Sequence, residues 1–235
     1  MKIPETRLRQ EANLHTHGEP DDHLTVVCFG ASSGGFEAYC TILGLLPSDT
    51  GMAYIIVHHQ PADEKSLLVE ILPRITDMPV MLVADGERVR ADCVYVVPAG
   101  MQVTMDGDEF HIRTLLKTHG WPKNITIFLQ SLAEDRQKRA IAVILSGFDS
   151  DGAAALQSIK QAGGLVFAQE FRTAKQPDMP QSAVRTGCVD RLLQPAEIAF
   201  QLKRIGEERA RFKGNAGENK KDIALAKSEN PITPE

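Results

Sequence analysis

Strand-like and helix-like segments alternate along about 180 of the chain's 235 residues, a pattern typical of a parallel sheet covered by helices on both faces. Short apolar runs predict the strands, and apolar residues at helical spacing predict the helices between them. The strands are expected at residues 24–29, 52–57, 80–83, 94–97, 141–145 and 165–168, and the helices at residues 36–46, 66–75, 125–136, 153–162, 182–186 and from residue 195 onward. We therefore predict an α/β fold, a three-layer α/β/α arrangement with a mostly parallel, doubly wound sheet.

One segment departs from this alternation. Residues 101–105 and 109–114 are two further strand-like runs, and they flank Asp106-Gly107. Asp-Gly between two such runs is a strong signal for a tight turn. The chain is therefore expected to contain one antiparallel hairpin beside the parallel sheet.

The two ends of the chain differ in composition from its middle. Residues 1–23 are polar and lack the apolar core of a secretory signal, so we expect a disordered leader. From residue 206 the sequence is charged and poor in bulky apolar residues, which predicts a helix end that frays into a disordered tail, residues 206–235. The folded part is expected at residues 24–205.

Composition excludes several classes of function. No apolar run approaches the roughly 18 residues that span a bilayer. A formal net charge of −5 and the lack of Lys/Arg clusters among aromatic residues argue against a nucleic-acid partner. The four cysteines are scattered without a CxxC pair, so we expect reduced thiols in a cytoplasmic protein, with neither disulfides nor a zinc site.

The stretch VVCFGASSGGFE, residues 26–37, is an apolar run followed by a Gly- and Ser-rich turn and a helix start. Within it, residues 30–34 fit G-x-S-x-G, a turn that presents a nucleophilic serine, here Ser32. The flanking glycines relieve crowding where the backbone bends sharply. The amide of Ser33 would then lie at a helix N-terminus, where it can bind an oxyanion.

Candidate catalytic side chains follow three of the predicted strands. Ser32 follows the first, His58 and His59 follow the second, and Asp149 and Asp151 follow a later one. Because ligands gather at the carboxyl ends of parallel strands, these side chains are expected to lie close together. A histidine can take the serine proton, and a carboxylate can orient that histidine and stabilise its charged form. The pattern predicts a nucleophilic triad of Ser32, His59 and Asp151.

Each member of this triad also has a simpler interpretation. Ser32 can be a turn or N-cap residue, His59 a strand-end histidine without a role, and Asp151 the N-cap of the following helix. The three simpler interpretations would have to hold together at three strand ends. The chain order Ser, His, Asp also differs from the Ser, Asp, His order of α/β-hydrolases, which disfavours that fold.

The turn GASSGG also resembles the TGASSGIG turn with which short-chain dehydrogenases bind a dinucleotide. Phe29 stands where a threonine is usual, and Phe36 stands where the last glycine is usual. The Tyr-x-x-x-Lys pair of these enzymes is absent, and histidines rather than an acidic residue end the second strand. These departures disfavour an NAD(P) oxidoreductase.

Three motifs follow one another along the chain: GASSGG at residues 30–35, HHQP at residues 58–61 and LSGFDSDGAAAL at residues 145–156. Together with DGERV, YVVPAG and MPQSAVRTG, they resemble the catalytic domain of protein-glutamate methylesterases, the CheB-type chemotaxis enzymes. The resemblance runs from about residue 24 to residue 204. The segments SLAED, AIAVILSG and TGCVDRLL are most similar to methylesterase-like domains found fused to methyltransferases.

This resemblance implies a serine hydrolase that removes methyl groups from glutamate methyl esters of chemoreceptor-type proteins, and some members of the family also deamidate glutamine. It places the catalytic serine at Ser32, the histidine at His59 and the aspartate at Asp151, with the backbone near Phe148 helping Ser33 to bind the oxyanion. It implies no metal and no organic cofactor. The implied partners are a methyl-accepting chemoreceptor or a similar methylated signalling protein, and a separate response regulator or methyltransferase.

Several residues depart from the pattern of the family. Thr126 stands where an aspartate is usual, Asp178 where a glycine is usual, and Asp149 where a small residue is usual. The leader is too short for a phosphoacceptor receiver domain, so we expect a stand-alone domain without phosphorylation gating in cis. The alternative is a catalytically idle, CheB-like signalling or scaffold module.

Overall fold

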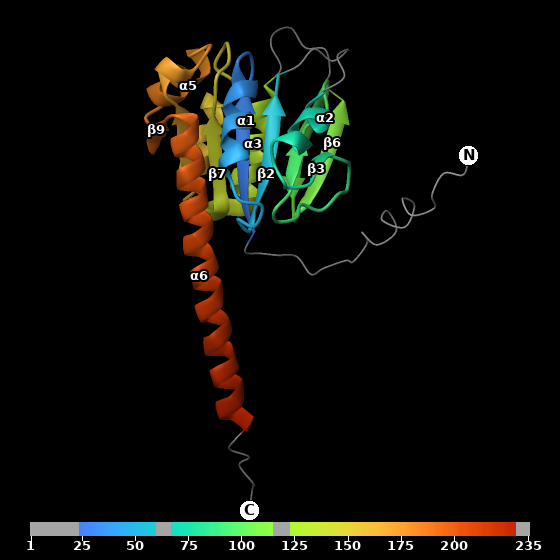
Figure 1. Cartoon of the computed structure of the whole chain (residues 1–235), viewed down its shortest axis with the longest axis vertical. Helices are drawn as coiled ribbons and strands as arrows, with labels where there is room; N and C mark the ends of the chain where they lie inside the picture. The colour runs from blue at the N-terminus through green and yellow to red at the C-terminus, as the bar shows by residue number, and fades with distance from the viewer. Residues whose placement is uncertain (1–23, 60–66, 115–122, 229–235) are drawn as a thin grey trace, which may run out of the picture.

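The computed structural model describes residues 24–59, 67–114 and 123–228, and from residue 212 onward it describes the backbone alone. The predicted leader, residues 1–23, and the last residues, 229–235, lie outside the described residues. The strands are β1 Thr25–Ala31, β2 Met52–His58, β3 Val80–Leu82, β4 Val94–Val96, β5 Met101–Asp106, β6 Glu109–Thr114, β7 Ala140–Ile144, β8 Leu165–Gln169 and β9 Arg191–Leu193. Seven of them form a parallel sheet in the order β3-β4-β2-β1-β7-β8-β9, and β5 and β6 form a separate antiparallel pair (Figure 1).

Helices cover both faces of this sheet, which confirms the predicted α/β fold. The helices are α1 Gly35–Leu45, α2 Leu68–Ile71, α3 Asn124–Arg136, α4 Leu156–Gln161, α5 Asp178–Arg185 and α6 Pro195–Ser228. Apolar side chains of α1, α2 and α6 form the core on one face, and those of α3, α4, α5 and the hairpin form the core on the other. The sheet is therefore the middle one of three layers.

The central strand β1 shows why such segments are buried strands. All seven of its residues are buried. Val26 and Cys28 pack into the core on the α3 face, whereas Val27 and Phe29 pack into the core on the α1 face. A strand that is buried on both sides needs apolar residues at every position, which is why it appears in the sequence as a continuous apolar run.

The hairpin turns one residue later than expected. Gly107 and Asp108 occupy its tip with φ values of 55° and 74°, and Asp106 pairs with Glu109 across the turn. Two consecutive residues with positive φ are typical of a type I′ turn, which matches the twist of the flanking strands. The fully buried Phe110 places the hairpin in the core on the α3 face.

Three elements differ from the sequence prediction. Helix α5 begins at Asp178 rather than at residue 182, because Pro180 falls in the first turn, where a backbone N–H has no helical acceptor. The edge strand β9 was not predicted, since its three residues are mostly exposed and show no apolar run. The expected helix at residues 66–75 is the short α2 followed by a tighter turn that contains Pro73.

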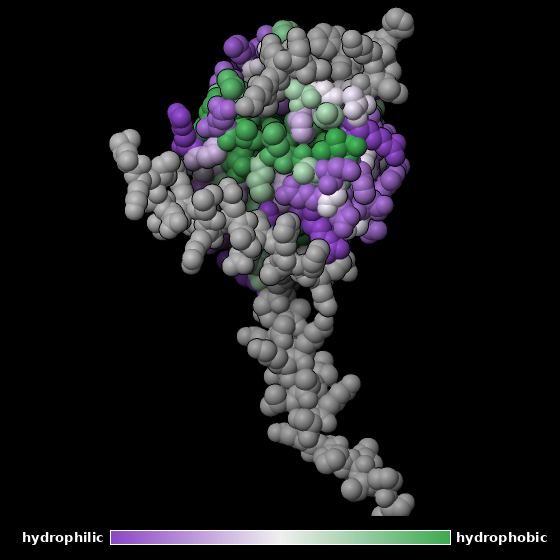
Figure 2. Space-filling model, turned by 90° about the vertical axis from the view of Figure 1, so that its right-hand side faces the viewer, coloured by the Kyte–Doolittle hydropathy of each residue, from purple (hydrophilic) through white to green (hydrophobic). Residues whose placement is uncertain are grey.

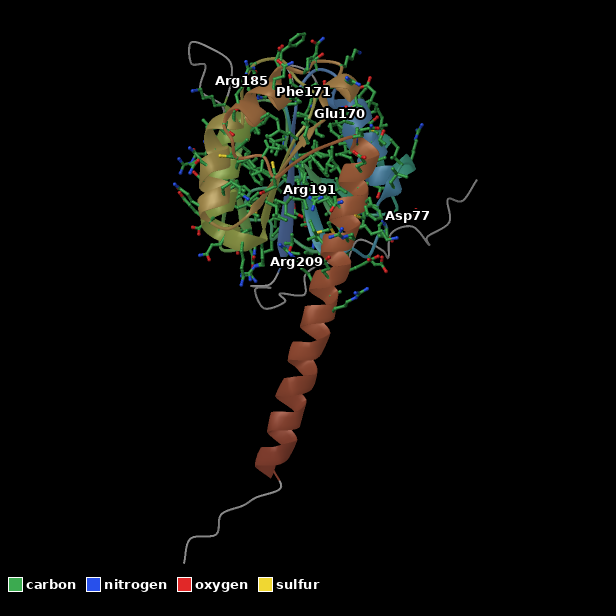
Figure 3. All side chains as sticks on the ribbon, turned by 90° about the vertical axis from the view of Figure 1, so that its left-hand side faces the viewer. Asp77, Glu170, Phe171, Arg185, Arg191 and Arg209 are labelled. Carbon is green, nitrogen blue, oxygen red and sulfur yellow. The ribbon has the colours of Figure 1, made fainter. Side chains whose placement is uncertain are left out.

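The last helix also extends beyond the expected boundary at residue 205. α6 continues to Ser228, so the structure has a helix where the sequence predicted a fraying tail. No proline interrupts this segment, and charged residues one helical turn apart pair along it, as Arg204 and Glu208 do at 3.4 Å. Arg209, labelled in Figure 3, hydrogen-bonds to the Thr25 side chain at the start of β1. The helix therefore stays attached to the sheet past residue 206.

Figure 2 views the molecule from the side on which β3 and β6 lie. An apolar area occupies the middle of this face, with polar residues beside it. β3 is the edge strand of the sheet, and its Leu82 is 44% exposed. β1 and β7 lie in the interior of the sheet, so this edge is separate from the strand ends that carry the candidate catalytic residues.

Candidate active site

The strand order places the candidate residues around one crevice. The chain passes from β1 to β2 on one side and later returns to β7 on the other, so the carboxyl end of β1 is a topological switch point. Ala31 pairs with His58, and the amide of His59 donates a hydrogen bond to Ala31 O at 3.1 Å. The amide of Ser32 donates to Ser146 O at 3.0 Å. Backbone pairing therefore brings the three predicted segments together.

His59 and Asp151 are in direct contact. The distance from His59 Nε2 to Asp151 Oδ2 is 2.8 Å, and the two side chains are only 6% and 4% exposed. Side chains alternate along a strand, and the odd-numbered residues of β2 (Ala53, Ile55 and Val57) face α3. This alternation, continued by one residue past the strand, directs His59 toward the face on which Asp151 lies.

Asp151 is held by the start of helix α3. Its Oδ2 accepts a hydrogen bond from the Ile125 amide at 2.9 Å, and its Oδ1 accepts from the Thr126 amide at 3.0 Å and the Thr126 hydroxyl at 2.6 Å. The Gly152 amide also donates to Oδ1 at 2.8 Å. Burial alone would raise the pKa of the Asp151 carboxyl, but the hydrogen bonds from His59 and from α3 outweigh burial and hold this pKa below its ordinary value. Asp151 is therefore an ionised acceptor at neutral pH.

This acceptor determines which nitrogen of His59 carries the proton. Because Asp151 can only accept, Nε2 must be the protonated nitrogen of the neutral ring, as inferred from the hydrogen-bond network. Nδ1 then carries the lone pair that can take a proton. Nδ1 is buried and has no hydrogen-bond partner among the described residues, and the closest carboxylate oxygen to it is Asp149 Oδ2 at 3.6 Å.

Ser32 is half-buried and directly follows Ala31, whose carbonyl accepts the hydrogen bond from the His59 amide. Within the described part of the chain, no hydrogen bond joins the Ser32 hydroxyl to His59. The segment after β7 packs closely against the serine: a Cβ built on Gly147 would lie 2.8 Å from Ser32 Cβ and would overlap the sulfur of Met179. Only glycine fits at residue 147 without moving the serine turn.

The two amides expected to bind an oxyanion belong to Ser33 and Phe148. Neither amide donates a hydrogen bond to another described residue, so both remain available as donors. Ser33 lies just before α1, where the positive end of the helix dipole favours negative charge. Phe148 follows β7 and is 50% exposed.

Ser146 joins the segments around the serine turn, and sequence reasoning missed it. Its hydroxyl donates to Ser33 O at 2.9 Å and accepts from the Gln176 amide at 2.9 Å. Its own amide donates to the side chain of Gln169 at 2.9 Å. The one available signal was a polar residue placed directly after a buried strand, which is too common to identify such a junction.

His58 faces the other side of the sheet from His59. Its ring meets the ring of Tyr39 edge-on, with 6.0 Å between the ring centroids, on the α1 face. Burial and, to a smaller degree, the neighbouring His59 lower the pKa of His58 to about 4. His58 is therefore neutral near pH 7.

The described residues contain no group of three or more His, Cys, Asp or Glu side chains that could hold a metal ion. The four cysteines are free, and three of them are buried. Across residues 24–59, 67–114 and 123–228, no helix combines the length and apolarity needed to cross a bilayer.

Comparison with known proteins links this geometry to a family. A family model described as CheB methylesterase matches residues 27–202. A protein-glutamate methylesterase/protein-glutamine glutaminase of Geobacter sulfurreducens is 31% identical over 191 residues, which are 80% of this chain and 52% of the relative. A relative from Leptospira interrogans is 30% identical over 182 residues, which are 77% of this chain and 94% of the relative.

A solved structure shares the fold. The crystal structure of the Thermotoga maritima CheB methylesterase catalytic domain matches with a TM-score of 0.72 and 26% sequence identity, and the match covers 77% of this chain and 98% of that domain. The chain thus spans about half the length of the Geobacter relative and nearly all of the Thermotoga domain.

Proposed function

Because the chain belongs to the CheB methylesterase family, we propose that it hydrolyses methyl esters of glutamate side chains on a chemoreceptor-type protein. The Geobacter sulfurreducens and Bacillus subtilis relatives are both named methylesterase and glutaminase, so the proposal includes deamidation of glutamine. The observation that carries it is the 2.8 Å contact between His59 and Asp151 beside the serine turn.

In the proposed reaction, Ser32 Oγ attacks the γ-carbonyl carbon of the ester while His59 Nδ1 accepts the hydroxyl proton. The tetrahedral intermediate then collapses, the bond to the methoxy oxygen breaks, and His59 returns the proton so that methanol leaves. Water adds to the acyl-enzyme in the same way and releases the glutamate carboxylate and the free serine. With a glutamine substrate the same steps release ammonia.

The contacts of the site support these roles. Asp151 keeps the proton of neutral His59 on Nε2 and stabilises the imidazolium that forms when Nδ1 is protonated. The amides of Ser33 and Phe148 are the proposed donors to the developing oxyanion. No hydrogen bond joins the Ser32 hydroxyl to His59 among the described residues, so the proposed reaction requires this bond to form in the substrate complex, where catalytic hydrogen bonds often tighten.

The test compares wild type with Ser32→Ala in methanol release from methylated receptor fragments. We expect Ser32→Ala to lose nearly all activity, whereas Ser182→Ala, which removes a hydroxyl on α5, should retain it. A fluorophosphonate probe should label the wild-type protein, and peptide mapping should place the label on residue 32.

The same experiment separates an enzyme from the idle scaffold module. The scaffold alternative predicts no fluorophosphonate labelling and receptor binding that Ser32→Ala leaves unchanged. Equal methanol release by wild type and Ser32→Ala would reject the proposed function. Ammonia release from glutamine-containing receptor fragments tests the deamidase activity separately.

A further inference from the structure

Asp149 is an acidic residue in the turn between β7 and Asp151, and its side chain is held in one place. Its backbone is left-handed, with a φ of 74°. Its Oδ1 accepts a hydrogen bond from the amide of Asp151 at 2.6 Å, an arrangement typical of an Asx turn. The backbone therefore fixes one carboxylate oxygen and leaves Oδ2 free to face another group.

That group is the imidazole of His59. Asp149 Oδ2 lies 3.6 Å from His59 Nδ1, while Asp151 Oδ2 lies 2.8 Å from Nε2 on the other side of the ring. The Asp149 side chain is 24% exposed and the His59 side chain is 6% exposed, so water screens their interaction only in part. The ring thus lies between two carboxylates, one beside each nitrogen.

The two carboxylates act on different protonation states. Asp151 holds the proton that the neutral ring already carries on Nε2. Asp149 faces Nδ1, which has only a lone pair in the neutral ring, so Asp149 gains no hydrogen bond there in the resting site. When Nδ1 takes the serine proton, the ring acquires a full positive charge, and the Asp149 carboxylate then attracts it.

We infer that Asp149 is a second positioning carboxylate of the active site, one that stabilises the charged ring formed when His59 takes the serine proton. This inference rests on the proposed function. Stabilisation that arises only when the proton moves lowers the barrier of the chemical step. The effect of Asp149 should therefore fall on kcat and not on KM.

The other groups around the ring do not supply this effect. His58, which precedes His59 in the chain, has a pKa lowered to about 4 by burial and by His59, so it stays neutral above pH 5. Cys28 faces Asp151 from β1, and burial raises the pKa of its thiol, so it stays neutral too. Among the described residues, Asp149 and Asp151 are the charged side chains in contact with the ring.

The main test is Asp149→Asn. Asparagine keeps an oxygen for the Asp151 amide and tolerates left-handed backbone, so this substitution removes the charge and preserves the turn. We expect kcat to fall about tenfold, the size expected of a partly screened charge acting across 3.6 Å. KM should stay close to the wild-type value, because the charge acts only when the ring is protonated in the reaction.

Two further variants serve as controls. Asp149→Gly also suits the positive φ but removes both the charge and the hydrogen bond to Asp151, so its kcat should fall further than that of Asp149→Asn. Asp77→Asn removes the same charge from an exposed residue before the start of β3 (labelled in Figure 3) and should leave kcat and KM unchanged.

A second measurement needs no turnover. Fluorophosphonate labelling of Ser32 also requires a base to take the serine proton, so Asp149→Asn should be labelled about tenfold more slowly than wild type. Equal labelling rates in the two proteins, or a loss of kcat/KM that falls on KM alone, would overturn the inference and leave the proposed function intact. A wild type that neither releases methanol nor reacts with the probe would instead reject the proposed function and this inference with it.

Discussion

His58 and His59 are neighbours in the chain, and the two faces of the sheet give them opposite surroundings. On the α1 face, His58 packs against Tyr39 and is a neutral buried ring. On the α3 face, His59 lies between the carboxylates of Asp149 and Asp151. Both rings are largely buried, so burial does not distinguish them. The difference lies in the partners that each face provides.

This comparison shows what the alternation of a strand contributes to an active site. On the α3 face, a helix N-terminus and an acidic turn lie at the carboxyl ends of β1 and β2. The helix N-terminus holds the Asp151 carboxylate, and the carboxylates of the turn can stabilise a protonated imidazole. The α1 face brings an aromatic side chain. A histidine that follows β2 therefore contacts carboxylates or packs against an aromatic ring according to the face it points to.

The largest expected difference is in catalysis. We expect His59→Ala to lower kcat by roughly 10⁴-fold or more, because it removes the group that moves the proton in both half-reactions. His58→Gln should retain activity near that of wild type. Methanol release from methylated receptor fragments measures both variants. A similar loss in the two variants would show that the faces are not functionally distinct.

The next effect is expected at Asp151. Asp151→Asn keeps the shape of the side chain but can place an NH₂ donor where an oxygen accepts from His59 Nε2. The neutral ring of His59 should then carry its proton on Nδ1 instead of Nε2. We expect kcat to fall by about 10⁴-fold with the fold retained. Circular dichroism checks the fold, and NMR of the ring nitrogens reports the tautomer. A variant with nearly full activity and an unchanged tautomer would contradict this role.

A smaller effect concerns stability and follows from the lowered pKa of His58. An unfolded histidine takes up a proton near pH 6.5, whereas folded His58 takes it up near pH 4. The contribution of neutral His58 to the free energy of unfolding is therefore fully present above pH 6.5, and it is lost as the pH falls toward 4. Between pH 6.5 and pH 4.5 the free energy of unfolding should fall by about 2 kcal/mol more in wild type than in His58→Gln. Urea denaturation at both pH values measures this difference, and equal losses would show that His58 is not buried in the neutral form.

The smallest effect is expected at Thr126. Its hydroxyl donates to Asp151 Oδ1 at 2.6 Å and accepts from the Gly152 amide at 2.8 Å. Thr126→Val should lower the free energy of unfolding by about 1 kcal/mol, whereas Thr126→Ser should be close to wild type. Denaturant unfolding distinguishes the two. If valine is tolerated as well as serine, the hydroxyl does not support Asp151.

Much of the fold could be predicted from the sequence because buried parallel strands have a distinctive pattern. β1 and β7 are apolar runs that end at polar residues. Because both strands are buried on both faces, they need apolar residues at every position, which makes them recognisable in the sequence. β9 and the length of α6 could not be predicted in this way. β9 is a short, mostly exposed edge strand. The apolar stripe of α6 ends at Ile205, and beyond it the helix is attached through the charged side chain of Arg209.

The candidate site could be predicted only in part. The strand ends predicted Ser32, His59 and Asp151 as candidates, because the topology of a parallel sheet gathers such residues at one edge, and the structure places His59 in contact with Asp151. The tautomer of His59 and the contact of Asp149 with its ring depend on angstrom-scale geometry. The left-handed backbone at residue 149, which positions the Asp149 side chain, was not evident from the sequence. The hydrogen bonds of Ser146 join segments that are far apart in the chain, so no local pattern encodes them.

The number of residues in β2 is constrained as well as their identity. Its pairing with β1 runs without interruption from Met52 to His58, so inserting or deleting one residue in this stretch would exchange the two imidazoles between the faces unless a bulge absorbed the change. Substitutions along the strand can be tolerated one at a time, whereas a single-codon change in length would abolish the proposed activity without altering any residue of the candidate site. Related domains that differ in length are therefore expected to place their insertions in the loops and not in this strand.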